Sequence, residues 1–307
     1  MRLFLLLLSL SMSLAVSCGA NAAERLNVLT SFSILGDMVE NIGGDHVAVT
    51  SLIQPDSDAH SYTPRPKDIG TLSKADLVVF NGLQFEGWMQ RLLDAAHYTK
   101  PVIIASTGIT PLPRGEDDDE DAHEHEHGHS HGQFDPHAWL SLANGQQYAR
   151  NIRDGLIKAD PAHADDYRAR ADHYIAEMQR LDAEVRGTLT ALPKNSVVVT
   201  SHAAFGYLAH SYGLTFLSPI GQSTDAEASA SNIATLIDKL RQKTPHALFV
   251  ENMSNPALIR QLSEETGIPI SGVFYSDALT RHGDGSTYLG MMAYNARQLA
   301  HVLNAFP

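Results

Sequence analysis

The strongest constraint on the fold is an alternation of short β-rich runs with helical patterns, which occurs twice along the chain. The first series predicts strands at 26–30, 47–53, 77–80 and 102–104. The second series predicts strands at 196–200, 214–217 and 247–250, and a weaker one at 269–271. Amphipathic helices are expected at 34–42, 66–75, 88–96, 231–241, 255–265 and 287–304. Such alternation is typical of parallel sheets covered by helices, so the sequence predicts an α/β fold with two parallel-sheet domains.

A long amphipathic stretch separates the two series. Asp160 can cap a helix and Pro161 suits a first helical turn, after which apolar residues recur at steps of three and four as far as Leu189. This pattern predicts one helix of about 30 residues, or about 45 Å, which could serve as a spine for both domains. A dimeric coiled coil is the alternative, but the apolar stripe is short and ends near Pro193.

We therefore expect four parts along the chain. Residues 1–23 form a signal peptide, 24–158 an N-terminal α/β domain, 159–192 the linking helix and 193–307 a C-terminal α/β domain. The first part combines a basic start, an apolar run at 3–16 and small residues up to Ala22, which is typical of secretory signals and predicts a periplasmic protein. We expect cleavage near Ala22 or Ala23; a lipid anchor at Cys18 is the alternative, although Ala15 fits a lipoprotein site poorly.

The charge distribution excludes one class of partner and marks one segment. The formal net charge is −13, and eight acids lie between Glu116 and Glu126, while no basic patch suggests a nucleic-acid partner. The segment 115–132 is of low complexity and lacks the apolar residues that a packed core needs. It also carries alternating histidines at His123, His125, His127, His129 and His131.

Alternating imidazoles attract metal, so we interpret this segment as a weak zinc-collecting loop; a solvated acidic linker is the alternative. Its formal match to the H-E-x-x-H pattern of zinc proteases is rejected, because that motif needs a packed helix to fix both ligands. The one cysteine of the chain, Cys18, lies in the signal segment, so a site in the mature protein must use imidazole and carboxylate.

Three other histidines are candidates for a fixed site. His60 and His202 follow predicted strands, and His137 lies just ahead of a predicted helix. In α/β sheets, ligands bind beyond the carboxyl ends of the strands, and we expect all three histidines to meet that rule.

Four short motifs make a resemblance specific. They are Asp-Ala-His-Ser-Tyr-Thr-Pro at 58–64, Asp-Pro-His-Ala-Trp-Leu at 135–140, Ser-His-Ala-Ala-Phe-Gly-Tyr at 201–207 and Tyr-Ser-Asp at 275–277. In this order the chain resembles the cluster A-I solute-binding proteins of ABC importers, the ZnuA- and TroA-like proteins, over nearly all of its mature length. The histidine-rich insertion resembles that of the zinc-binding branch. The resemblance implies a metal site in the interdomain cleft, with His60 and His137 from the first domain and His202 and Asp277 from the second.

Two departures from the zinc-binding branch bear on this ligand set. Ala59 stands where zinc-binding relatives often have a glutamate, which leaves Asp277 as the natural fourth ligand, and the second domain has no cysteine pair. Manganese-binding members tend to have a carboxylate where this chain has His202, and three imidazoles with one carboxylate suit zinc. The resemblance also implies that Glu227 or Glu251 docks the permease, although Glu251 could equally brace the cleft. Asp135 could orient a ligand or cap the following helix.

The expected function is capture of Zn²⁺ and its delivery to an ABC importer permease, by a monomer and without catalysis. A periplasmic zinc chaperone is a further candidate partner. The alternatives are a periplasmic zinc carrier or adhesin without a transporter and, less favoured, a zinc hydrolase, because Asp277 would close the position that a catalytic water needs. Protons compete with metal for imidazole, so affinity should fall as the pH drops through about 6.5.

Overall fold

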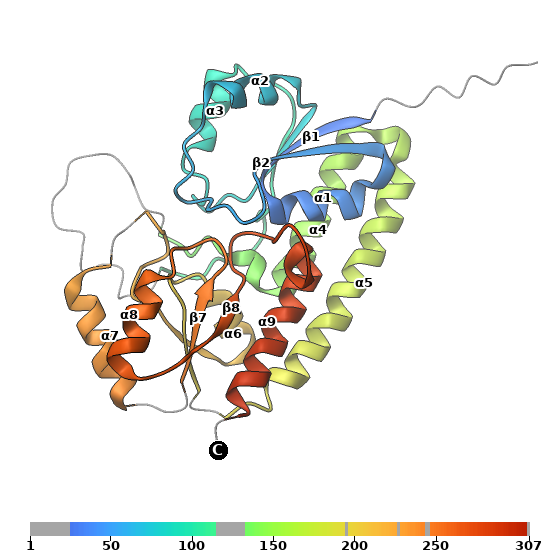
Figure 1. Ribbon diagram of the computed structural model, residues 1–307. Helices are drawn as coiled ribbons and strands as arrows, with labels where there is room; N and C mark the ends of the chain where they lie inside the picture. The colour runs from blue at the N-terminus through green and yellow to red at the C-terminus, as the bar shows by residue number, and fades with distance from the viewer. Residues whose placement is uncertain (1–24, 115–132, 194–195, 226–227, 243–245, 306–307) are drawn as a thin grey trace, which may run out of the picture.

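The computed structural model describes residues 25–114, 133–193, 196–225, 228–242 and 246–305, and it shows two four-stranded sheets, one above the other in Figure 1. The first sheet contains β1 (Leu26–Phe32), β2 (Val47–Ile53), β3 (Leu77–Phe80) and β4 (Val102–Ile104). The second contains β5 (Val197–Val199), β6 (Thr215–Leu217), β7 (His246–Glu251) and β8 (Ile270–Phe274). The strand orders are β2-β1-β3-β4 and β6-β5-β7-β8, and every pairing is parallel. The predicted α/β class with two parallel sheets is confirmed.

This topology has one point of reversal in each sheet. From β1 the chain moves to β2 on one side and then returns to add β3 on the other, and β5, β6 and β7 repeat the same path. The order of strands therefore reverses beside β1 and beside β5. Crevices form at the carboxyl ends of strands at such points, because successive connections leave in opposite directions.

Helices cover both sheets. They are α1 (Ser33–Gly43), α2 (Pro66–Lys74), α3 (Met89–Ala95), α4 (Leu142–Ala159), α5 (Ala164–Leu189), α6 (Gly206–Tyr212), α7 (Ala230–Gln242), α8 (Ala257–Thr266) and α9 (Tyr288–Leu303). Helix α1 follows β1 directly and buries the apolar face that the sequence predicts. It ends at Gly43, and the next residue, Gly44, has a φ of 56°, which suits glycine because a Cβ atom disfavours this conformation.

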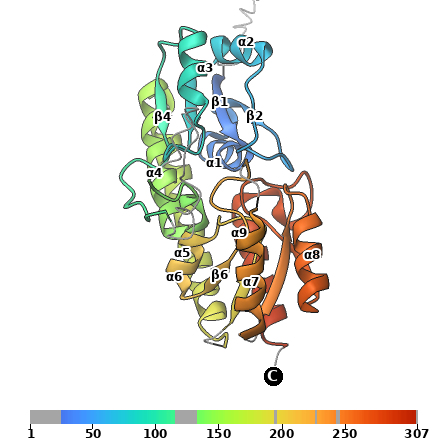
Figure 2. The ribbon, with the colours of Figure 1, turned by 90° about the vertical axis from the view of Figure 1, so that its left-hand side faces the viewer.

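The predicted spine is present in a shorter form. Helix α5 has 26 residues and packs against α4, α1 and α9, so that it runs beside both sheets (Figures 1 and 2). It begins later than expected, because Pro161–His163 forms a separate 3₁₀ turn. The Asp160 carboxylate accepts a hydrogen bond from the Tyr167 hydroxyl and contacts the His163 ring, and it does not cap the helix as predicted.

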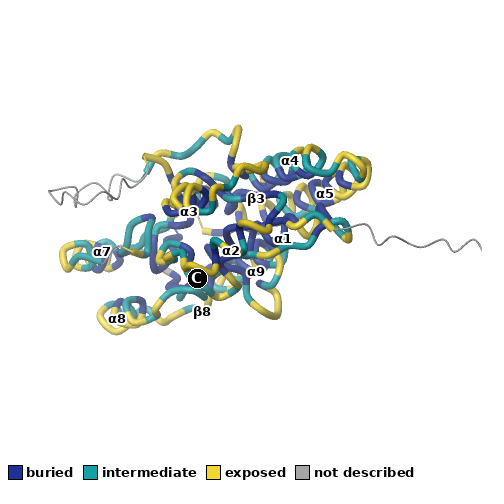
Figure 3. The backbone as a smooth tube through the Cα atoms, turned by 90° about the horizontal axis from the view of Figure 1, so that it is seen from above, coloured by how far each residue is buried: buried dark blue, intermediate teal, exposed yellow. Residues whose placement is uncertain are grey.

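One hydrophobic core connects the two halves. A single cluster of buried side chains extends from β1 and α1 through α4 and α5 to α9, and a smaller cluster lies beneath α7 and α8. Seen from above, buried segments of α1 and α9 occupy the middle of the molecule (Figure 3). In the described part of the chain, no helix combines the length and the apolar character needed to cross a bilayer. The predicted signal peptide and the histidine-rich segment, with His123, His125, His127, His129 and His131, lie outside the described residues.

Candidate metal centre

The structure brings the four predicted ligands together. His60, His137, His202 and Asp277 each offer one donor atom, and these atoms lie within 4.8 Å of one another. The Nε2 atom of His60 is 3.2 Å from Nε2 of His137 and 3.3 Å from Oδ2 of Asp277. Asp277 Oδ2 is also 3.0 Å from Nε2 of His202. Donors that surround zinc tetrahedrally at about 2.0–2.1 Å are about 3.4 Å apart, and these three distances are close to that value.

Three of the four donors come from segments that follow strands. His60 lies in the loop after β2, His202 follows β5, and Asp277 follows β8. His137 departs from the expectation, because β4 ends at Ile104 and a long connection separates it from this histidine. His137 instead reaches the centre from the segment directly ahead of the 3₁₀ turn Ala138–Leu140, which leads into α4.

The centre is buried, and the polar atoms of two of its four residues lack hydrogen bonds from the described residues. His137, His202 and Asp277 have no exposed surface, and the His60 side chain is 5% exposed. Within the described residues, both carboxylate oxygens of Asp277 and both ring nitrogens of His202 lack a hydrogen bond of good geometry. Burying a carboxylate in this way is costly unless a cation compensates it. A divalent cation among the four donors would provide that compensation.

Asp135 fixes the orientation of His137. Its Oδ1 atom lies 2.8 Å from Nδ1 of His137 and accepts a second hydrogen bond, of 2.9 Å, from the backbone N–H of the same residue. With a proton on Nδ1, the lone pair of Nε2 faces the centre. Of the two roles considered for Asp135, the structure shows contact with the His137 ring and no side-chain cap on the 3₁₀ turn that follows.

Glu251 contacts His202 in the way that Asp135 contacts His137. It ends β7 and is 1% exposed. Its Oε1 atom accepts a hydrogen bond of 3.0 Å from the His202 backbone N–H, and its Oε2 atom lies 2.8 Å from Nδ1 of the ring. Oε2 also accepts a hydrogen bond from the Ser276 hydroxyl, beside Asp277. Glu251 thus braces the cleft and is too buried to dock a permease, whereas Glu227 lies outside the described residues.

Burial and neighbouring charges shift the pKa values of three of the four candidate ligands. Burial opposes ionisation of Asp277, but His202 and His137 hold the pKa of this carboxyl well below its ordinary value. For His202, burial lowers the pKa, yet the negative charges of Glu251 and Asp277 outweigh it and raise the pKa well above normal. Burial lowers the pKa of His60, in keeping with a neutral imidazole. The site therefore favours positive charge at its centre.

Aromatic rings pack against two of the candidate ligands. The Phe85 ring lies 4.8 Å from the His60 ring and 5.9 Å from the His137 ring, measured between centroids. The Trp139 ring lies 5.3 Å from His137, and its indole N–H donates to the Ser276 carbonyl over 2.9 Å. Trp139 belongs to one of the four motifs, but no sequence signal pointed to Phe85, which lies in the connection between β3 and α3.

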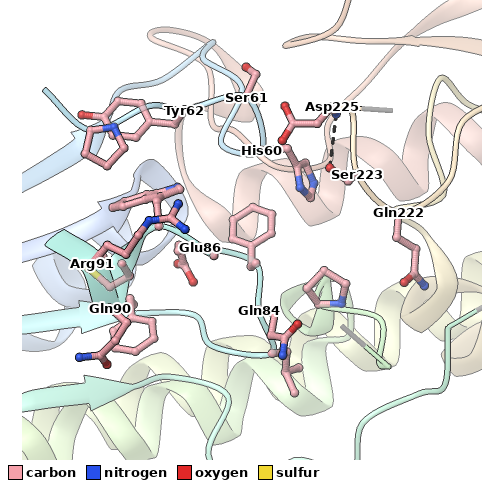
Figure 4. A pocket seen from close by; sticks show the side chains of 18 of the residues that line it. His60, Ser61, Tyr62, Gln84, Glu86, Gln90, Arg91, Gln222, Ser223 and Asp225 are labelled. Carbon is pink, nitrogen blue, oxygen red and sulfur yellow. Dashed lines mark hydrogen bonds between the residues drawn. The ribbon is translucent and has the colours of Figure 1, made fainter. Parts of the chain in front are cut away.

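A cavity of about 910 Å³ adjoins the centre on the side of His60 (Figure 4). Of the four candidate ligands, His60 alone lines it, together with Tyr62, Trp88, Arg91 and Gln222 among others. The other three candidate ligands do not line the cavity and have no exposed surface. An ion from outside would therefore meet His60 first.

Comparisons with known proteins agree with this architecture. The family model described as ZnuA, zinc-uptake complex component A, periplasmic, matches residues 28–302. The manganese ABC transporter substrate-binding lipoprotein PsaA of Streptococcus anginosus is 32% identical over 98% of both chains. The iron-binding protein YfeA of Yersinia pestis is 33% identical over 91% of this chain and 87% of its own length.

Two solved structures show the same fold. The periplasmic zinc binding protein TroA from Treponema pallidum superposes with a TM-score of 0.82 at 27% identity, over 91% of this chain and 99% of that one. The Mn-bound periplasmic metal binding protein from Candidatus Liberibacter asiaticus gives a TM-score of 0.78 at 29% identity, over 91% and 100%. The chain belongs to the ZnuA family, the periplasmic metal-binding components that serve as substrate-binding proteins of ABC transporters.

Proposed function

We propose that this protein captures Zn²⁺ in the periplasm and delivers it to the membrane permease of an ABC importer. The observation that carries the proposal is the buried set of His60, His137, His202 and Asp277, whose donor atoms surround one point. The Asp277 carboxylate lacks a hydrogen bond within the described residues, and a bound cation would supply its partner. Three imidazoles and one carboxylate form the kind of four-coordinate shell that zinc adopts.

The donor set, more than the names of relatives, favours zinc. Relatives are named for manganese and iron as well as zinc, so likeness alone does not choose among these metals. Manganese prefers oxygen donors and a higher coordination number, whereas this centre offers one carboxylate and three nitrogens. His202 is decisive here, because a carboxylate at this position would make the donor set half oxygen.

A transport role fits the site better than catalysis. Catalytic zinc usually keeps one coordination position open for water, and here a fourth protein donor, Asp277, lies where that water would bind. The family membership adds a permease and an ATPase as working partners, which favours import over a free carrier or an adhesin. Some relatives are named as lipoproteins, which supports a lipid anchor at Cys18 as the alternative to cleavage near Ala22. The intact mass of the mature protein would distinguish a lipidated Cys18 from cleavage near Ala22.

Metal competition tests the proposal. Protein purified from the periplasm, given equal Zn²⁺ and Mn²⁺ in a chelator-buffered solution, should bind one zinc, as measured by native mass spectrometry. The substitution His202→Ala should lower zinc affinity by more than the roughly 10- to 100-fold that loss of an outer-sphere partner causes. His301→Ala is the matched control, because His301 is exposed on α9. Preferential manganese binding, or unchanged zinc affinity in His202→Ala, would overturn the assignment.

A further inference from the structure

The two walls of the cleft are joined in different ways on its two sides. On the side of Asp277, four hydrogen bonds among the described residues connect the segment after β8 to the N-terminal half of the chain. One of them, of 3.3 Å, runs from the Arg281 N–H to Asp56 Oδ2. Trp139 Nε1 donates to the Ser276 carbonyl over 2.9 Å, and the Leu279 N–H donates to Ser33 Oγ over 3.0 Å. The Asp56 N–H donates to the Leu279 carbonyl over 2.9 Å. Most of these groups are buried, so water does not compete for the bonds and this side is firmly closed.

On the side of His60, the Asp58 carboxylate joins the walls. Asp58 Oδ1 accepts a hydrogen bond of 2.9 Å from the backbone N–H of His60. Asp58 Oδ2 accepts a hydrogen bond of 2.7 Å from the hydroxyl of Thr224, which lies in the connection between β6 and α7. The same carboxylate therefore holds the backbone of a candidate ligand and the opposite wall of the cleft.

This contact lies at the accessible edge of the centre. Asp58 and Thr224 are half-buried, in contrast to the bonds around Asp277. Figure 4 shows His60 beside Ser223 and Asp225, the neighbours of Thr224, at the margin of the cavity. Hydrogen bonds that water can reach open more readily than buried ones. Opening of the cleft should therefore begin here, with the side of Asp277 acting as the hinge.

We propose that Asp58 and Thr224 form a latch, and that this latch keeps His60 in place over the bound metal. This inference rests on the proposed function, because it concerns the escape of the ion held by His60, His137, His202 and Asp277. The latch contributes no donor to the metal. It sets how often His60 and the Thr224 segment move apart, and so it controls the rate at which the metal leaves.

Dissociation kinetics test the latch. A hydrogen bond to a charged group is strong enough that its loss in Thr224→Val should speed zinc release about tenfold. The rate is measured by mixing the zinc-loaded protein with excess chelator in a stopped-flow instrument. Thr224→Ser keeps the hydroxyl and should release zinc at the wild-type rate. Ser223→Ala is the matched control, because the Ser223 hydroxyl accepts a bond from the Asp225 N–H within its own loop.

The second half of the test starts from Asp58. Asp58→Asn should also speed zinc release. In the double variant, Thr224→Val should speed release by less than it does in the wild type, because both substitutions weaken the same hydrogen bond. Equal rates for Thr224→Val and wild type, or equal acceleration by Thr224→Val and Ser223→Ala, would overturn the latch. Either result leaves the proposed zinc capture standing, provided that the wild type retains one zinc in the presence of the chelator. A wild type that binds no zinc overturns the proposed function itself.

Discussion

At the scale of single residues, the buried carboxylates Asp135 and Glu251 determine how the imidazoles behave. Asp135 contacts Nδ1 of His137 and Glu251 contacts Nδ1 of His202, so each ring is turned with Nε2 toward the centre. Together with Asp277 they place three carboxylates around two rings in a region without exposure to water. A divalent cation offsets much of this negative charge, so the outer carboxylates should strengthen metal binding as well as orient the rings.

The substitution Glu251→Gln tests this role. Glutamine keeps an oxygen that can accept from the His202 backbone N–H, but it removes the negative charge behind the ring. Zinc affinity should fall by roughly 10- to 100-fold, as measured by chelator competition. Glu264→Gln, an exposed change on α8, is the control and should leave affinity unaltered. If Glu251→Gln binds zinc with wild-type affinity, Glu251 contributes to the fold and not to metal binding.

The sequence predicted these residues to different degrees. His60 and His202 follow strands, and that position predicted their convergence from the residues alone. Asp277 also follows a strand, β8, but the strand predicted at 269–271 ended short of Phe274, so Asp277 depended on the family resemblance. Phe85 could not be predicted, because its contact with His60 depends on the path of the connection between β3 and α3.

At the scale of secondary-structure elements, Asp37 joins three helices. It lies on α1, and its Oδ2 atom accepts a hydrogen bond of 3.0 Å from the N–H of Tyr288, the first residue of α9. The same oxygen lies 3.3 Å from the hydroxyl of Tyr174 on α5. Burial is the main cause that raises the pKa of Asp37 to about 6. Ionisation of this carboxyl therefore costs stability in the folded protein.

This shift predicts a pH dependence of stability. Since the folded-state pKa of Asp37 exceeds its ordinary value of 3.8, its contribution is fully present below pH 3.8 and is lost as the pH rises through about 6. The difference in melting temperature, wild type minus Asp37→Asn, should therefore decrease as the pH is raised from 4 to 7, as measured by calorimetry on the metal-free proteins. Asp45→Asn, an exposed change, is the control. A difference that stays constant with pH, or that moves in the opposite direction, would contradict the assignment.

The elements themselves were largely predictable, and the exceptions have local causes. The strands are short apolar runs, and β1, β3 and β5 are buried along most of their length, which gives these three a clear sequence pattern. Helix α6 was not predicted; it has seven residues and begins at Gly206, a residue that disfavours a helix. The first turn of the spine was misassigned because the Asp160 side chain bonds to Tyr167, an interaction that spacing alone does not indicate.

At the scale of the whole molecule, one continuous core limits how far the two halves can move. The main hydrophobic cluster includes side chains from both sheets and from α5, which packs against α1 and α9. A large hinge opening would expose this core, whereas parting of the cleft at its accessible edge would not. Release of metal should therefore proceed through local movement near His60, and the rest of the molecule should stay rigid.

The histidine-rich segment can be removed without disturbing this frame. Its flanks lie side by side, because the Arg114 N–H donates to the Gln133 carbonyl over 3.1 Å and Pro113 forms an antiparallel bridge with Phe134. The four candidate ligands all lie outside residues 115–132. Replacing that segment with two glycines should therefore close a short turn and leave the centre intact.

We expect the shortened protein to retain one tightly bound zinc and to lose additional weak binding, as measured by native mass spectrometry and calorimetric titration. The reason is that the centre has a fixed, buried donor set, whereas the excised segment offers imidazoles without an apolar anchor. Replacing its five histidines with serine keeps the acids. This control separates the contribution of the imidazoles to weak metal binding from that of the negative charges. Loss of all metal from the shortened protein would mean that the histidine-rich segment, and not the cleft, is the principal site.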